Sequence, residues 1–119
     1  MSEAAVLLEG LRAQETKYRA VAACADDQAR AMERADLDAL LAIVGRQSAA
    51  LADVEALERR IAPLRARWPE LKATADAATV RAVEETLART RELLKSMIGE
   101  APAPTRAAAA WNARRAYGA

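Results

Sequence analysis

Apolar side chains recur every three or four residues along most of this chain, a spacing that is typical of helices. A first series, over about residues 3–33, consists of Ala4, Leu8, Leu11, Tyr18, Val21, Ala25 and Met32. A second series begins Leu37, Leu40, Val44, Gln47, Leu51 and Val54 and continues to Leu71. A third consists of Val80, Val83, Leu87, Thr90, Leu94 and Met97. Because an α-helix has about 3.6 residues per turn, each series forms one apolar helix face.

Capping residues divide this pattern into three expected helices, at about residues 3–33, 36–68 and 76–98. Ser2 and Asp36 suit the N-cap positions of the first two helices, and Thr74 or Asp76 suits that of the third. Their side-chain oxygens can accept a hydrogen bond from an otherwise unpaired backbone N–H group.

Proline and glycine residues predict where these helices bend or end. Pro63 is expected to kink the second helix near residues 59–62, because an interior proline removes a hydrogen bond and clashes with the preceding turn. Pro69 is expected to end that helix, leaving residues 70–76 as a turn or short connector. Gly99 suits the position just past the end of the third helix.

Composition favours a thin molecule over a compact globule. Alanine makes up more than a quarter of the chain, phenylalanine is absent and aromatic residues total 3%. Alanine is the best helix former and lets helices approach closely. We therefore predict an all-α fold for residues 1–99: an elongated, coiled-coil-like antiparallel bundle of three long helices.

Residues 100–119 are predicted to form a separate linker and tail. The stretch A-P-A-P at 101–104 is typical of an extended linker, and an alanine-rich segment with Trp111 and Tyr117 follows. An isolated helix of that length is only marginally stable in water. We expect a flexible tail that forms a short helix when something accepts its two aromatic side chains.

Most catalytic and metal-binding chemistry lacks its usual residues in this sequence. There is no histidine, the four glycines are isolated from one another, and Cys24 is the single cysteine. These absences remove Ser–His and Cys–His pairs, a glycine-rich phosphate loop and a four-ligand zinc site. The carboxylate pairs Asp26–Asp27 and Glu84–Glu85 are expected to be solvated. We expect no enzymatic activity, no metal and no cofactor.

The charge balance gives no reason to expect a nucleic acid partner. The net charge is +1, although residues 101–119 carry three arginines and no acidic residue. No apolar run approaches the roughly 20 residues of a membrane-spanning helix, and no signal peptide is recognisable. The expectation is a cytoplasmic protein that does not insert into a membrane.

Protein binding is the remaining class of function, and the C-terminal part carries its main candidates. Trp111 and Tyr117 belong to the residue types that dominate binding hot spots, although the tail could also dock on its own bundle. An apolar seam left open along the bundle could accept an amphipathic helix from a partner, or could pair two copies into a homodimer. The sequence leaves a monomer and a homodimer as alternatives.

The stretch A-M-E-R-A-D-L-D-A-L-L-A-I-V-G-R-Q-S-A-A-L-A-D-V-E-A-L-E-R-R at residues 31–60 resembles the FlgN family of flagellar export chaperones. That family commonly opens its second helix with G/A-D-L-x-x-L and continues with K-x-x-L-L-x-x-L-x-x-L-E-x-x-R. Here Asp36 and Leu37 match the opening, whereas Arg46–Gln47 stands where the lysine is expected and Pro63 interrupts a helix that is usually continuous.

The resemblance implies a cytoplasmic chaperone without ATPase activity. Such a protein binds the C-terminal helical segments of the hook–filament junction proteins and delivers them unpolymerised to the flagellar type III export apparatus. By the same resemblance, the partner-binding residues would be Leu87, Leu94, Met97, Ile98, Trp111 and Tyr117. A self-associating coiled-coil structural or adaptor protein, or a secretion chaperone of the FliT type, is the alternative.

Overall fold

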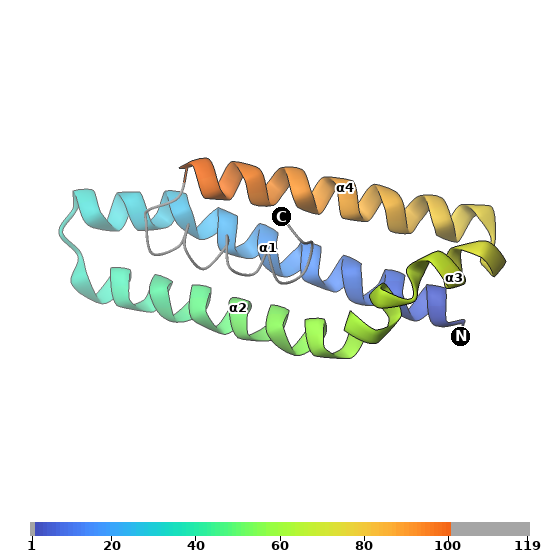
Figure 1. Cartoon of the computed structure of the whole chain (residues 1–119). Coiled ribbons are helices and arrows are strands. Elements are labelled where there is room, and N and C mark those ends of the chain that lie inside the picture. Colours follow the sequence, from blue (N-terminus) through green and yellow to red (C-terminus); the bar gives the residue numbers. More distant parts are fainter. Residues whose placement is uncertain (1, 101–119) are drawn as a thin grey trace.

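The computed structural model describes residues 2–100, which form four helices. These are α1 (Glu3–Glu33), α2 (Leu37–Ala66), α3 (Trp68–Thr74) and α4 (Ala77–Glu100). The first two form an antiparallel hairpin, and α4 runs beside α1 in the same direction (Figure 1). The structure measures 54 × 23 × 21 Å along its principal axes, so the expected elongated helical bundle is present.

Hydrogen bonds at the helix starts confirm the predicted caps. The Ser2 hydroxyl accepts a hydrogen bond from the backbone N–H of Ala5 at 3.1 Å. The Asp36 carboxylate accepts one from Ala39 at 3.0 Å. Asp76, one of the two residues predicted to cap the last helix, accepts one from Thr79 at 2.8 Å. Each cap satisfies an N–H group that has no partner within its helix.

The α1–α2 hairpin turns within three residues. The backbone N–H of Ala35 binds the carbonyl of Met32, and that of Asp36 binds the carbonyl of Ala31, which is the hydrogen-bond pattern of a Schellman motif. Ala35 adopts a left-handed φ of 52°, as the residue after a helix C-cap does in this motif. Asp36 then starts α2, so one residue closes the first helix and opens the second.

The structure contains a fourth, short helix beside the three long ones, and two helices end at other residues than expected. The connector expected at residues 70–76 is mostly the short helix α3, in which Pro69 is the second residue. Proline is tolerated in a first helical turn because the N–H group there has no helical partner. The second helix continues through Pro63 and ends at Ala66 rather than at 68. Gly99 lies inside α4 rather than just past it.

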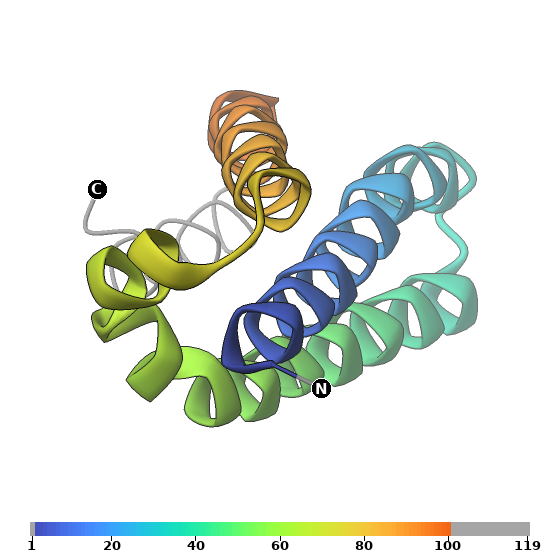
Figure 2. The ribbon, with the colours of Figure 1, turned by 90° about the vertical axis from the view of Figure 1, so that its right-hand side faces the viewer.

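Two apolar clusters, each built from α1, α2 and α4, form the core. One lies near the start of α1 and contains the buried residues Leu7, Leu11, Ile61 and Val83. The other lies further along α1 and contains Tyr18, Val21, Val54, Leu94 and Met97. Viewed along the bundle, α1 lies between α2 and α4 (Figure 2). Each cluster thus fastens both outer helices to the central one.

A close approach of α1 to α2 depends on a glycine. Gly10 is buried on α1, and a Cβ atom added there would lie 2.3 Å from Cγ2 of Ile61. Ile61 is 2% exposed and belongs to the first apolar cluster, so it has little space to move. A glycine in this helix costs about 1 kcal/mol relative to alanine, but it allows the two helices to touch.

We predict that Gly10→Ala destabilises the protein by about 1–3 kcal/mol, because overpacking at Ile61 outweighs the gain in helix propensity. The measurement is the free energy of unfolding from urea titration followed by circular dichroism. Gly45→Ala is the matched control: it is also a helical glycine, but nothing lies within 4 Å of its added Cβ. That control should gain about 0.5–1 kcal/mol. Equal gains for both variants would contradict the packing argument.

Candidate functional site

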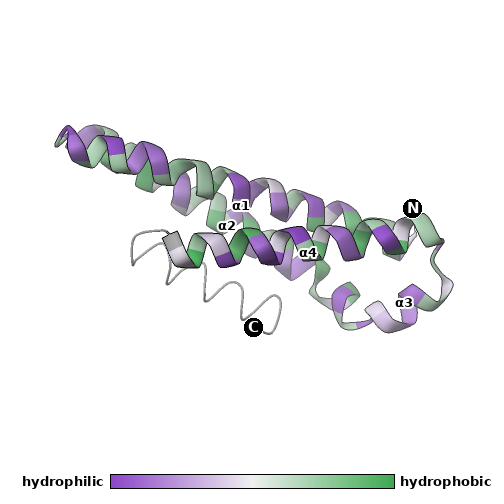
Figure 3. Cartoon of the chain, turned by 90° about the horizontal axis from the view of Figure 1, so that it is seen from above, coloured by the Kyte–Doolittle hydropathy of each residue, from purple (hydrophilic) through white to green (hydrophobic). Residues whose placement is uncertain are grey.

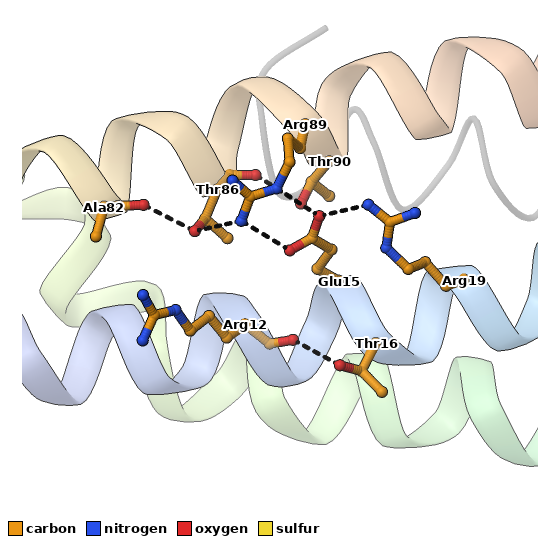
Figure 4. Close-up of polar contacts among 8 residues, drawn as sticks. All are labelled: Arg12, Glu15, Thr16, Arg19, Ala82, Thr86, Arg89 and Thr90. Carbon is orange, nitrogen blue, oxygen red and sulfur yellow. Dashed lines mark hydrogen bonds and ion pairs between the residues drawn. The ribbon is translucent and has the colours of Figure 1, made fainter.

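A layer of polar side chains separates the two apolar clusters. Glu15 on α1 is only 7% exposed. Its carboxylate accepts hydrogen bonds from Arg89 on α4, through Nε at 3.0 Å and Nη2 at 3.2 Å, and from Arg19 Nη2 at 3.0 Å (Figure 4). The two arginines remain about half exposed, so water reaches one side of this arrangement.

The charges in this layer stabilise one another. The hydrogen bond from Arg89 is the largest influence on Glu15 and lowers the pKa of its carboxyl group, while burial opposes that effect. In return, Glu15 raises the pKa of the Arg89 guanidinium. The buried Thr86 and Thr90 donate their hydroxyls to carbonyls one turn earlier in α4, at 2.7 and 2.8 Å. In this part of the layer, Glu15, Thr86 and Thr90 are therefore all hydrogen-bonded.

A second part of the layer joins α1 to α2. Gln14 is fully buried, and its Nε2 donates to the carbonyl of Val54 at 3.3 Å and to the Glu58 carboxylate at 3.2 Å. Glu58 also forms an ion pair with Arg65, two turns further along α2. Among the described residues, nothing hydrogen-bonds Oε1 of Gln14. These contacts connect particular residues of the two helices and therefore favour a single alignment of α1 against α2.

The principal exposed apolar surface lies at the turn end of the α1–α2 hairpin. Met32, Leu37 and Leu41 are 61%, 64% and 61% exposed, and Val44 is 42% exposed. We call these four residues the hairpin-end strip. The hairpin extends past the end of α4 in this region, which leaves the strip uncovered by the described chain (Figure 3).

The hairpin-end strip continues a face of α2 that packs against the second apolar cluster. On α2, Leu37, Leu41, Val44, Ser48 and Leu51 follow one another at steps of four and three residues, so they share one helix face. Leu51 packs against the cluster that contains Leu94 and Met97 of α4. The same face of α2 is therefore partly buried in the core at Leu51 and exposed from Val44 to the turn.

The facing side of α1 has a similar run, and a hollow lies at its end. Ala22, Ala25, Ala29 and Met32 also follow steps of three and four, and Ala22 packs against the same cluster as Leu51. A depression of about 250 Å³ at the turn is lined by Ala31, Met32, Ala35, Asp36, Leu37 and Leu40. Small alanine side chains beside exposed leucines form a surface that another helix can approach closely.

The structure places the predicted partner-binding residues of α4 in the core. Leu94 and Met97 are buried at 2% and 6% exposure, and Leu87 and Ile98 are partly buried against the two clusters. A partner could reach Leu94 and Met97 only if α4 separated from α1. Trp111 and Tyr117 lie outside the described residues. The role of these six residues in binding stays a prediction.

The spacing argument missed the hairpin-end strip as a binding surface. Met32, Leu37 and Val44 belong to the apolar series from which the helices were predicted, and they were treated as part of the buried face. A usable signal was the difference in length between the helices. A last helix of 24 residues cannot cover hairpin arms of 31 and 30 residues from end to end.

We predict that Glu15→Gln lowers the free energy of unfolding at neutral pH by about 1–2 kcal/mol, because it weakens charge-assisted hydrogen bonds to arginines that are half exposed. The folded-state pKa of Glu15 is lowered, so its stabilisation is present above the ordinary carboxyl pKa of about 4.3 and is lost as pH falls through the lower folded value. The difference between the two proteins should therefore shrink below about pH 4.

Urea titrations across this pH range provide the measurement. Glu9→Gln is the control, because Glu9 is an exposed carboxylate on the same helix. A difference for Glu15→Gln that stays constant down to pH 2 would show that lost packing, rather than lost charge, destabilises the variant.

Comparisons with known proteins do not extend these observations. None of the described helices is long and apolar enough to cross a membrane. Among residues 2–100, no group of three or more cysteine, aspartate or glutamate side chains is placed to hold a metal ion. The chain matches no protein-family model, no curated protein and no solved structure.

Proposed function

We propose that this chain is a non-enzymatic chaperone that binds an amphipathic helix of a protein partner on the hairpin-end strip. The sequence of residues 31–60 resembles the FlgN family, and this resemblance suggests the partner: the C-terminal helical segments of flagellar hook–filament junction proteins. In this proposal the chaperone works in the cytoplasm and keeps its partner unpolymerised until export. It masks a surface and makes or breaks no covalent bond.

The exposed hairpin-end strip carries this proposal. Four large apolar side chains are 42–64% exposed on adjoining helix faces, and further along the hairpin the same faces contribute to the cluster that contains Leu94 and Met97 of α4. An amphipathic helix with its apolar side chains three and four residues apart would fit there as α4 does. Clustered apolar groups on a surface are typical of interaction sites.

The strip replaces the buried part of α4 as the proposed contact surface. Binding through Leu94 and Met97 would require loss of the second apolar cluster and of the Glu15–Arg89 ion pair. Binding at the strip requires neither loss, because its residues are already exposed. We retain Trp111 and Tyr117 as candidate contacts, since they follow α4 in the sequence.

A direct test uses the purified full-length chain and purified hook–filament junction proteins of its own organism in isothermal titration calorimetry. We predict that the double substitution Leu37→Ser and Leu41→Ser weakens binding about 30-fold or more, equivalent to about 2 kcal/mol of lost apolar contact. The double substitution Ala49→Ser and Ala56→Ser changes exposed residues on another face of α2 and should leave affinity unchanged.

Two controls separate this function from its alternatives. Urea titration should show that the Leu37→Ser and Leu41→Ser protein still folds and loses at most about 1 kcal/mol of stability, because both leucines are exposed in the described chain and serine is a slightly weaker helix former. Sedimentation equilibrium identifies self-association: a dimer that these two substitutions dissociate would favour the self-assembling coiled-coil protein. No detectable binding to junction proteins by the parent chain would reject the chaperone function.

A further inference from the structure

Beyond the end of α4, the described chain leaves apolar faces of α1 and α2 uncovered, and we call this surface, from Leu51 to the turn, the groove. Leu94 and Met97 of α4 pack with Val21 of α1 and Val54 of α2, and α4 ends three residues after Met97. From Leu51 to Leu37 the groove continues for 14 residues of α2, or about 21 Å at about 1.5 Å per residue. Its walls are the hairpin-end strip and the alanines of α1.

We propose that residues 106–119 of this same chain occupy the groove, docking Trp111 on the hairpin-end strip. The proposal deepens the proposed function, because it names what covers the binding surface in the absence of a partner, but docking can be measured with no partner present. A partner helix would then have to displace the segment, so the chain's own C-terminal part would compete with the partner for one surface.

The position and length of this part of the chain support docking within one molecule. The helix α4 runs toward the turn end of the hairpin, so Glu100 precedes the uncovered part of the groove (Figure 1). Residues 101–105 can span up to about 17 Å at roughly 3.3–3.6 Å per residue, and Trp111 lies six residues beyond them. The whole 21 Å groove is therefore within reach of Trp111.

Charge and side-chain type also match the segment to this end of the hairpin. Residues 26–38 carry five acidic residues and two arginines, for a net charge of −3. Residues 101–119 carry three arginines and no acidic residue, for +3. Trp111 and Tyr117 supply large apolar surfaces, and the hollow of about 250 Å³ beside Met32 and Leu37 offers a place for one ring.

Fluorescence of Trp111 provides the test. Trp68 is the other tryptophan, and it packs partly buried against the first apolar cluster, so Trp68→Phe leaves Trp111 as the single emitter while keeping a ring at residue 68. In that full-length background, a docked Trp111 should emit at short wavelength and resist quenching by acrylamide. Adding Leu37→Ser and Leu41→Ser should shift the emission to longer wavelength and raise the quenching constant severalfold.

Further variants and a dilution series test whether something other than this segment of the same molecule covers the hairpin-end strip. Adding Ala49→Ser and Ala56→Ser instead should leave both signals unchanged. A Trp111 that is quenched as strongly as a free tryptophan in the Trp68→Phe protein would overturn the proposal. So would protection that the leucine substitutions do not alter, or protection that disappears on dilution, which would mean that a second copy supplies the segment.

A second measurement covers the case in which Trp68→Phe unfolds the chain. Methyl NMR spectra of the wild-type protein and of full-length Trp111→Ala should differ at Leu37, Leu41 and Val44 and agree at Ile61 and Val83, which lie at the other end of the bundle. Identical spectra at the three strip residues would overturn docking, whereas failure to bind junction proteins would overturn only the proposed function.

Discussion

The packing of α1 against two helices at once determines the rest of this structure. Tyr18 and Leu11 on α1 are almost completely buried because α2 and α4 cover neighbouring faces of the same helix. Few side chains are large enough to fill such a core, so the helices must approach closely. Gly10 provides this where Ile61 meets α1, and alanines provide it further along. The thin bundle and its small core have the same cause.

A core made of small, similar apolar residues does not by itself select one alignment of the helices. Leucine, valine and alanine recur at the same spacing along every helix, so a shift by one helical turn would bury much the same surface. The polar layer opposes such a shift. A shifted α4 would separate Arg89 from the buried Glu15, and a shifted α2 would separate Glu58 from Gln14. Burying either partner alone costs more than the pair contributes, so the layer specifies the alignment.

The sequence predicts local structure well here and predicts contacts between helices poorly. The caps at Ser2 and Asp36 were predictable, and that of the last helix was narrowed to Thr74 or Asp76, because a cap is a short-range contact. The helix α3 was missed because Pro69 was interpreted as a helix end, whereas it lies in a first turn. The contact of Gly10 with Ile61 and the Glu15–Arg89 ion pair each join residues that are far apart in the sequence. A single sequence does not show which distant residues come together.

The hairpin-end strip illustrates the same limit, because the exposure of its side chains depends on how far a neighbouring helix extends over them. Leu37, Leu41 and Val44 continue the spacing of the buried residues, so periodicity alone predicts that they are covered. They are exposed because α4 is shorter than the hairpin that it covers. Packing among the described helices accounts for the apolar character of Val54 and Ile61 on α2. It does not account for that of Leu37 and Leu41, which is explained if another helix or segment covers them.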